Sequence, residues 1–281
     1  MDTKSSVSQT AMLIASLRAL ACYEDDLLIH GNDSLAELFL PEEKRRALRS
    51  SDIREMIKKA IPEGLYEYVI ARTQYFDELF SKSLRRQIPQ IVLLGAGYDS
   101  RAYRFADLMK NSKIYEVDAS PTQNVKHRIL QENAVTVHPN VSYVAADFEQ
   151  DDWVHGLFEA GYQSSLRTLY IWEGVTFYLT PETVDSTLAL LRQNSLPGSI
   201  LSFDYQHKDE EHALIDTGLQ EENVKFGLDV HTCDSYLQRR GYSVIEKVDS
   251  ETLAQCFLTM SDGKRFGEVK SIMNIVTAEI N

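Results

Sequence analysis

The sequence predicts an α/β fold, in which a mostly parallel seven-stranded sheet follows a helical N-terminal segment. Apolar residues recur at helical spacing in residues 1–88, whereas residues 89–281 alternate short apolar runs with segments of helical composition. A Gly-x-Gly turn, at Gly95 and Gly97, follows the first of these runs. Strands that alternate with helices build a parallel sheet covered on both faces. We therefore expect a helical cap at residues 1–88 and an α/β domain at residues 89–281.

Four segments of the cap are predicted to be helical. In the first segment apolar side chains return every three or four positions, and in the last several aromatic side chains do the same. Pro41 ends the second segment, and Pro62 with Gly64 marks a turn before the fourth. The four segments are residues 10–23, 34–40, 42–60 and 65–83.

Seven short segments of the second domain are predicted to be strands. The first is an almost continuous apolar run, as expected of a parallel strand that is buried on both faces. Between strands, Thr180 is suited to cap a helix that has Pro181 at its first position and extends to about Asn194. Another helix is predicted near residues 234–240. The strands are residues 90–94, 113–117, 141–146, 167–172, 199–204, 242–248 and 269–278.

Composition narrows the range of functions. The chain carries 29 Lys and Arg against 42 Asp and Glu, and this net charge of −13 disfavours binding to nucleic acid. Its three cysteines are far apart, so neither a disulfide framework nor a metal site is expected. No apolar stretch approaches the roughly 20 residues of a membrane span, and the polar N-terminus does not resemble a signal peptide. We expect a cytoplasmic protein that acts on a small molecule, with a homodimer as one option for its assembly.

The clearest local signal is the turn after the first strand. Gly95 and Gly97, with Ala96 between them, let the backbone turn tightly and approach a ligand, because glycine has no Cβ. In open parallel sheets such a loop lies at the carboxyl edge of the strands, where ligands bind. Gly-x-Gly alone is a weak signal, since a tight strand-to-helix turn can use the same residues.

An acidic residue ends the second predicted strand. Asp118, which Ala119 follows, lies 21 positions after Gly97 and can accept hydrogen bonds from both hydroxyls of an adenosine ribose. Ser100 replaces the third glycine of a dinucleotide fingerprint, whose role is close packing beneath a pyrophosphate. S-adenosylmethionine (SAM) has no pyrophosphate. The pattern therefore favours SAM over a nicotinamide dinucleotide.

Two further strand ends carry acids. Asp147 and Phe148 follow the third strand, where a carboxylate suits the exocyclic amine of adenine and an aromatic ring can cover the base. Glu173 follows the fourth strand, where it can face the positive sulfonium or ammonium group of SAM. Trp172, beside it, is equally well explained by core packing. Acids at the carboxyl ends of three strands predict one anionic crevice that also contains the glycine turn.

At these positions the sequence resembles the leucine carboxyl methyltransferase family, in particular a bacterial branch similar to the polyketide O-methyltransferase of tetracenomycin biosynthesis. The similarity extends over nearly the whole chain, in the expected order and spacing. The matching stretches include residues 71–77 (ARTQYFD), 92–104 (VLLGAGYDSRAYR), 115–118 (YEVD), 146–148 (ADF), 173–179 (EGVTFYL), 197–199 (PGS) and 203–205 (FDY).

This resemblance implies the class I methyltransferase fold, a Rossmann-like seven-stranded sheet whose last strand is antiparallel. It also implies that Arg72 pairs with the carboxylate of SAM and that Glu173 lies near the methionine amino group. By itself, the sequence around Arg72 would suggest an exposed arginine on a helix. Together with the motifs above, the predicted cofactor-binding residues are Arg72, Gly95, Ala96, Gly97, Asp118, Ala119, Asp147, Phe148 and Glu173.

The N-terminal part departs from the family pattern. Bacterial relatives usually have an acid soon after the pair that is Arg18-Ala19 here, and an Asp-Pro before the next helix. In this chain the acid arrives late, at Glu24, and Asp33 is followed by serine. The part of the cap that faces the acceptor is therefore expected to differ, and the acceptors of relatives are a weak guide to the acceptor of this chain.

Methyl transfer to an oxygen is the predicted reaction. A carboxylate is ionised at neutral pH and needs no base, whereas a phenol, with a pKa of about 10, would benefit from one. Tyr178, and His207 just after the fifth strand, are the candidates for contact with the acceptor, although His207 also fits an ordinary loop histidine. We expect the acceptor to be a small molecule such as a polyketide acid. A nicotinamide-dependent oxidoreductase and a non-catalytic nucleoside-binding protein of the same fold are the alternatives.

Overall fold

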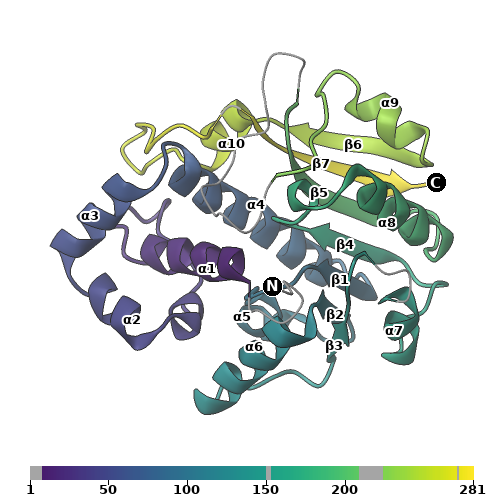
Figure 1. Cartoon of the computed structure of the whole chain (residues 1–281), viewed down its shortest axis with the longest axis horizontal. Coiled ribbons are helices and arrows are strands. Elements are labelled where there is room, and N and C mark those ends of the chain that lie inside the picture. The colour runs from purple at the N-terminus through teal and green to yellow at the C-terminus, as the bar shows by residue number, and fades with distance from the viewer. Residues whose placement is uncertain (1–7, 150–152, 209–223, 271) are drawn as a thin grey trace.

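Figure 1 shows the computed structural model of the chain, which describes residues 8–149, 153–208, 224–270 and 272–281. Within these residues one seven-stranded sheet runs through the molecule in the order β3-β2-β1-β4-β5-β7-β6. Strands β1 to β5 pair in parallel, and β7 is antiparallel to both β5 and β6. The strands are β1 (Gln90–Leu94), β2 (Lys113–Asp118), β3 (Val141–Ala145), β4 (Thr168–Trp172), β5 (Ile200–Gln206), β6 (Tyr242–Val248) and β7 (Met273–Ile280). The predicted mixed sheet with an antiparallel last strand is confirmed.

Helices cover both faces of the sheet, with α1 to α4 on one side and α7 to α9 on the other (Figure 1). The described α-helices are α1 (Gln9–Ala21), α2 (Glu42–Leu48), α3 (Ser51–Ala60), α4 (Leu65–Arg85), α5 (Arg101–Arg104), α6 (Ser120–Glu132), α7 (Trp153–Glu159), α8 (Pro181–Gln193), α9 (Cys233–Gln238) and α10 (Ser250–Phe257). Short 3₁₀ turns are η2 (Ala36–Phe39), η3 (Ala106–Leu108) and η4 (Thr176–Tyr178).

The sheet separates two hydrophobic cores, because successive side chains of a strand point to opposite faces. In β1, Ile91 and Leu93 belong to the core that α1, α4 and α10 cover, whereas Val92 and Leu94 belong to the core that α7, α8 and α9 cover. Burial on both faces explains why β1 is apolar from Ile91 to Leu94 and why the sequence reveals its bounds.

Helix α4 packs directly on the sheet. The hydroxyl of Tyr68 donates to Asp204 of β5 at 2.6 Å, and the hydroxyl of Tyr75 donates to Glu246 of β6 at 2.9 Å. The N-terminal helices also share their apolar core with β1. We keep residues 1–88 as a proposed cap, with α4 as the part that joins it to the α/β domain.

Two predicted elements differ from the structure. Residues 42–60 form two helices rather than one, because the side chain of Ser50 accepts the N–H of Ile53 and thereby caps a new helix, α3. Strand β7 begins at Met273, later than predicted, and continues to Ile280. Among the described helices, none is long and apolar enough to cross a lipid bilayer.

Candidate functional site

A crevice of about 670 Å³ opens at the carboxyl ends of β1 to β4. This volume lies in the usual range of pockets for small molecules and cofactors. Helix α1 supplies one wall, with Ala11, Ile14 and Arg18. Every predicted cofactor residue lines the crevice: Arg72, Gly95, Ala96, Gly97, Asp118, Ala119, Asp147, Phe148 and Glu173. The structure thus brings these residues together, while their roles stay predictions.

The glycine loop, residues 95–97, depends on conformations that favour glycine. Gly95 has φ = +69° and Gly97 has φ = +42°. The N–H groups of Gly95 and Ala96 both donate to the carbonyl of Val117, at 2.8 and 3.0 Å, which fixes the loop against β2. A Cβ on Gly95 would overlap a methyl group of Val175. The loop therefore needs glycine for its backbone angle and also for space.

We expect Gly95→Ala to lower the free energy of unfolding by about 1–3 kcal/mol from backbone strain alone, and by more once Val175 is displaced. Urea denaturation measures this change. Gly263→Ala is a matched control, because Gly263 also has a positive φ, +83°, but has open space where the Cβ would lie. If the two variants lost the same stability, the overlap with Val175 would have no effect.

Asp118 connects the end of β2 to the glycine loop. One carboxylate oxygen accepts the N–H of Gly97 at 2.5 Å, and the other accepts the N–H of Ala119 at 2.7 Å. Burial raises the pKa of Asp118, and the two N–H groups, with the charge of Lys126, act in the opposite direction. Each carboxylate oxygen has two acceptor positions, so both can still receive a hydroxyl from a ligand.

Phe148 and Asp147 form the rim of the crevice after β3. The ring of Phe148 packs edge-on against Trp153, with 5.7 Å between the ring centroids. Its centroid also lies 6.3 Å from that of Trp172. Asp147 accepts the N–H of Glu149 at 3.0 Å. These contacts hold an aromatic ring and a carboxylate side by side at the mouth of the crevice, which is the pair of groups that adenine recognition requires.

Arg72 is buried rather than exposed on its helix. Only 3% of its surface is accessible, and its Nε and Nη1 atoms pair with Glu173 and Asp204, each at 3.0 Å. Among the described residues, no group accepts a hydrogen bond from its other terminal nitrogen, Nη2. A buried guanidinium with an unpaired donor beside a crevice is suited to bind an anionic ligand group.

Asp204, in β5, is a functional residue to which the sequence analysis gave no role. It is fully buried and accepts from Tyr68 at 2.6 Å, from Arg72 at 3.0 Å and from the N–H of Gly174 at 2.7 Å. Asp204 therefore holds both the arginine and the turn after β4 in place. Its signal in the sequence is an acid between two aromatic residues, Phe203 and Tyr205, of a buried strand.

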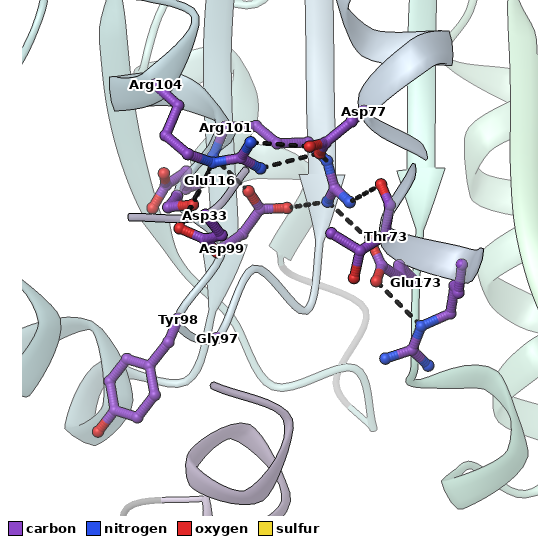
Figure 2. A network of polar contacts seen from close by, with 12 residues as sticks. Asp33, Thr73, Asp77, Gly97, Tyr98, Asp99, Arg101, Arg104, Glu116 and Glu173 are labelled. Carbon is purple, nitrogen blue, oxygen red and sulfur yellow. Dashed lines mark hydrogen bonds and ion pairs between the residues drawn. The ribbon is translucent and has the colours of Figure 1, made fainter. Parts of the chain in front are cut away.

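Arg101 was also given no role, although it belongs to the glycine motif. Figure 2 shows its guanidinium between Asp77, Asp99 and Glu173, at 2.8, 2.6 and 2.7 Å. It is fully buried, and its Nη2 also donates to the carbonyl of Thr73 at 3.4 Å. Asp99 and Glu173 line the crevice but Arg101 does not. Arg101 is therefore a positioning residue that joins α4, the loop after β1 and the end of β4.

The ionic network continues from Arg101 toward α1. Arg104 pairs with Asp77 at 2.7 Å and with Asp33 at 3.4 Å (Figure 2). Arg18 of α1 pairs with Asp33 at 3.5 Å and donates to the carbonyl of Tyr98 at 2.6 Å. These contacts hold α1 against the residues that follow the glycine loop.

A second cavity, of about 70 Å³, adjoins the crevice. The two share a wall of five residues, which are Thr10, Ile14, Arg72, Gly174 and Tyr178. The rest of the second cavity is mainly apolar, and its charged lining residues are Arg72 and Lys270, both cations.

The two predicted catalytic residues lie in different places. Tyr178 lines both cavities. His207 lines neither cavity in the part of the chain that the structure describes, since its Nδ1 accepts the N–H of Val230 at 3.3 Å and its own N–H donates to Ile272. His207 is therefore not among the lining residues of either cavity, and its catalytic role stays a prediction. In the same described residues, no group of three His, Cys, Asp or Glu side chains is arranged to hold a metal ion.

Comparisons with known proteins agree with this arrangement. The sequence profile of the leucine carboxyl methyltransferase family matches residues 11–192. A relative from Mycobacteroides abscessus is 30% identical over 215 residues, which cover 74% of this chain and 69% of the relative. A relative from Mycobacterium sp. strain KMS is 30% identical over 259 residues, covering 86% and 85%. Both are named as S-adenosyl-L-methionine-dependent methyltransferases.

Solved structures show the same fold. A crystal structure from Thermobifida fusca, of a protein assigned as a methyltransferase, has a TM-score of 0.59 and 16% identity, and the match covers 100% of this chain and 97% of the other. An O-methyltransferase family protein from Burkholderia thailandensis has a TM-score of 0.50 and 8% identity, covering 86% and 61%. The predicted class I methyltransferase fold is confirmed. The chain belongs to the leucine carboxyl methyltransferase family.

Proposed function

We propose that this protein is a SAM-dependent O-methyltransferase whose acceptor is the carboxylate of a small molecule, of which a polyketide acid is one example. The observation that carries the proposal is the single crevice in which the glycine loop, Asp118, Phe148 and Arg72 meet. These groups suit, in turn, the methionine backbone, the ribose, the adenine and the methionine carboxylate of SAM.

The crevice fits the charges of this cofactor. SAM, when bound, supplies a methyl group activated by a positive sulfonium, and it also carries an ammonium and a carboxylate. Among the described residues, five acids line the crevice against two cations, Arg18 and Arg72, and the unpaired donor of Arg72 suits the carboxylate of SAM; the acids are Asp99, Asp118, Asp147, Glu149 and Glu173. Glycine at positions 95 and 97 leaves room for the ligand to approach the backbone.

Catalysis in this proposal consists mainly of positioning. Holding two reactants in line and excluding water can contribute on the order of 7–11 kcal/mol. The walls of α1 and the residues after β4 restrict where an acceptor can lie, and Tyr178 borders both cavities. These residues hold the acceptor oxygen and the cofactor at the shared wall, and no covalent intermediate with the protein is required.

The charge of the second cavity supports a carboxylate acceptor. A phenol has a pKa of about 10 and would need a base to remove its proton, whereas a carboxylate is already ionised. The residues that line the second cavity include no Asp, Glu or His, but include the cations Arg72 and Lys270. An acceptor that arrives as an anion matches this lining.

Calorimetry and a turnover assay test the proposal. We expect SAM and its demethylated product, S-adenosylhomocysteine (SAH), to bind with micromolar affinity, and NAD(H) not to bind. We also expect conversion of SAM to SAH with a carboxylic acid from a mixed panel of carboxylates and phenols. Binding of NAD(H) without SAM would favour the oxidoreductase alternative, and SAM binding without any turnover would favour a non-catalytic nucleoside-binding protein.

A further inference from the structure

We propose that the second cavity is an acceptor subsite that receives a short, narrow apolar chain, so that the preferred acceptors are small aliphatic carboxylic acids. The reacting carboxylate would lie at the shared wall, beside Tyr178 and Gly174. This inference rests on the proposed function, because it assigns the acceptor of the same reaction.

The first observation that supports this subsite is the position of the second cavity. It meets the crevice only through the shared wall, where Arg72 and Gly174 border both spaces. An acceptor carboxylate at this wall would have the cofactor crevice on one side and the second cavity on the other. Whatever group is attached to that carboxylate must then extend into the second cavity or into solvent.

The second observation is the mainly apolar lining of this cavity. Beyond the shared wall most of the lining is apolar, with Gln206, Lys270 and the hydroxyl of Tyr68 as its polar groups; the apolar side chains include Leu13 of α1, Leu65 of α4, Phe177, Ile272 and Met273. The hydroxyl of Tyr68, which also lines it, already donates to Asp204. An apolar chain can therefore fill the space without leaving that hydroxyl unsatisfied, and it gains free energy from burial.

The third observation is the small volume of this cavity. Typical pockets for whole drug-sized ligands measure about 300–1,000 Å³. A space of about 70 Å³ admits only a few carbon atoms. The subsite would therefore discriminate acceptors by the length and width of the chain attached to the carboxylate. Long or bulky groups would not fit in it.

Two side chains offer a direct test, because they line the second cavity and not the crevice. Leu13 and Leu65 are half-buried and come from different helices. Phenylalanine at either position would fill the subsite from one side and leave the glycine loop, Asp118 and Phe148 of the crevice unchanged. Leu27, which is 85% exposed and lines neither cavity, provides a matched control as Leu27→Phe.

The experiment titrates straight-chain carboxylates, from acetate to octanoate, into the complex of the protein with SAH and follows binding by NMR. In the wild-type protein and in Leu27→Phe, we expect affinity to rise about fourfold per added methylene over the first few carbons and then to level off. We expect Leu13→Phe or Leu65→Phe to lose this rise while SAH affinity stays unchanged. Thermal melting identifies the variants that are folded.

The outcomes separate this inference from the proposed function. If the wild-type protein fails to bind SAH, the proposed function itself fails. If SAH binds but affinity for the carboxylates does not depend on chain length, the subsite assignment is overturned and the proposed function stands. A chain-length rise that persists in both filled variants overturns the assignment as well.

Discussion

Replacement of Arg101 by methionine is expected to lower the free energy of unfolding by about 3–5 kcal/mol, because it leaves buried carboxylates without their cation. Arg101 is fully buried and is the common partner of Asp77, Asp99 and Glu173. Urea denaturation monitored by circular dichroism measures the loss. Arg265, which pairs with Glu251 and Glu268 at the surface, is the control, and we expect little change in Arg265→Met.

The pH dependence of the same variant separates an electrostatic role from simple packing. Burial by itself raises the pKa of Asp99, but the positive charges of Arg101, Lys126 and Arg18, together with the N–H of Arg101, bring the pKa down to about 2, and Arg101 contributes most of this lowering. A depressed pKa stabilises the fold above the unfolded value of 3.8, and this contribution is lost as the pH falls toward 2. In Arg101→Met, Asp99 takes up its proton at a higher pH, so acid unfolding should begin earlier. An acid transition that stays at the wild-type pH would show that Asp99 does not depend on this arginine.

Replacement of Asp118 by alanine is expected to weaken SAM binding by about 100-fold or more. Two hydrogen bonds from ribose hydroxyls to a charged carboxylate contribute about 1.5–3 kcal/mol each, and a loss of about 3 kcal/mol corresponds to two orders of magnitude in affinity. The change also releases the N–H of Gly97, which Asp118 accepts at 2.5 Å.

Calorimetry with SAM measures the effect of Asp118→Ala. Asp107→Ala is the control, because Asp107 is an exposed acid outside both cavities. Asp118→Asn keeps the shape of the side chain but loses its charge, and we expect it to bind SAM with intermediate affinity. If Asp118→Ala bound SAM with unchanged affinity, Asp118 would not be a ribose-binding residue.

The parts of the fold that the sequence predicts well depend on local signals. The bounds of β1 and β6 agree with the prediction, because β1 is an apolar run from Ile91 to Leu94 that is buried on both faces, and β6 is bounded by a turn at Gly241. The cofactor crevice could be predicted for a geometric reason. Parallel strands place their carboxyl ends at one edge, so residues that follow β1, β2 and β4 must lie near one another.

The parts that the sequence could not predict depend on distant partners. Arg72 meets Asp204, 132 positions away, and Arg101 meets Glu173, 72 positions away. No local pattern indicates such pairs. His207 also has a partner that is distant in the sequence, because its imidazole accepts the N–H of Val230, 23 positions later. The break between α2 and α3 has neither proline nor glycine to mark it.

The position of β7 has a consequence for how the chain matures during synthesis. Strands β5 and β6 do not pair with each other, because Met273–Ile280 lies between them and binds both. Until those eight residues leave the ribosome, each of the two strands keeps an open edge that can pair with another nascent chain. This half of the described sheet is therefore completed only when β7, which follows β5 and β6 in the chain, takes its place between them, and until then both strands are exposed to aggregation.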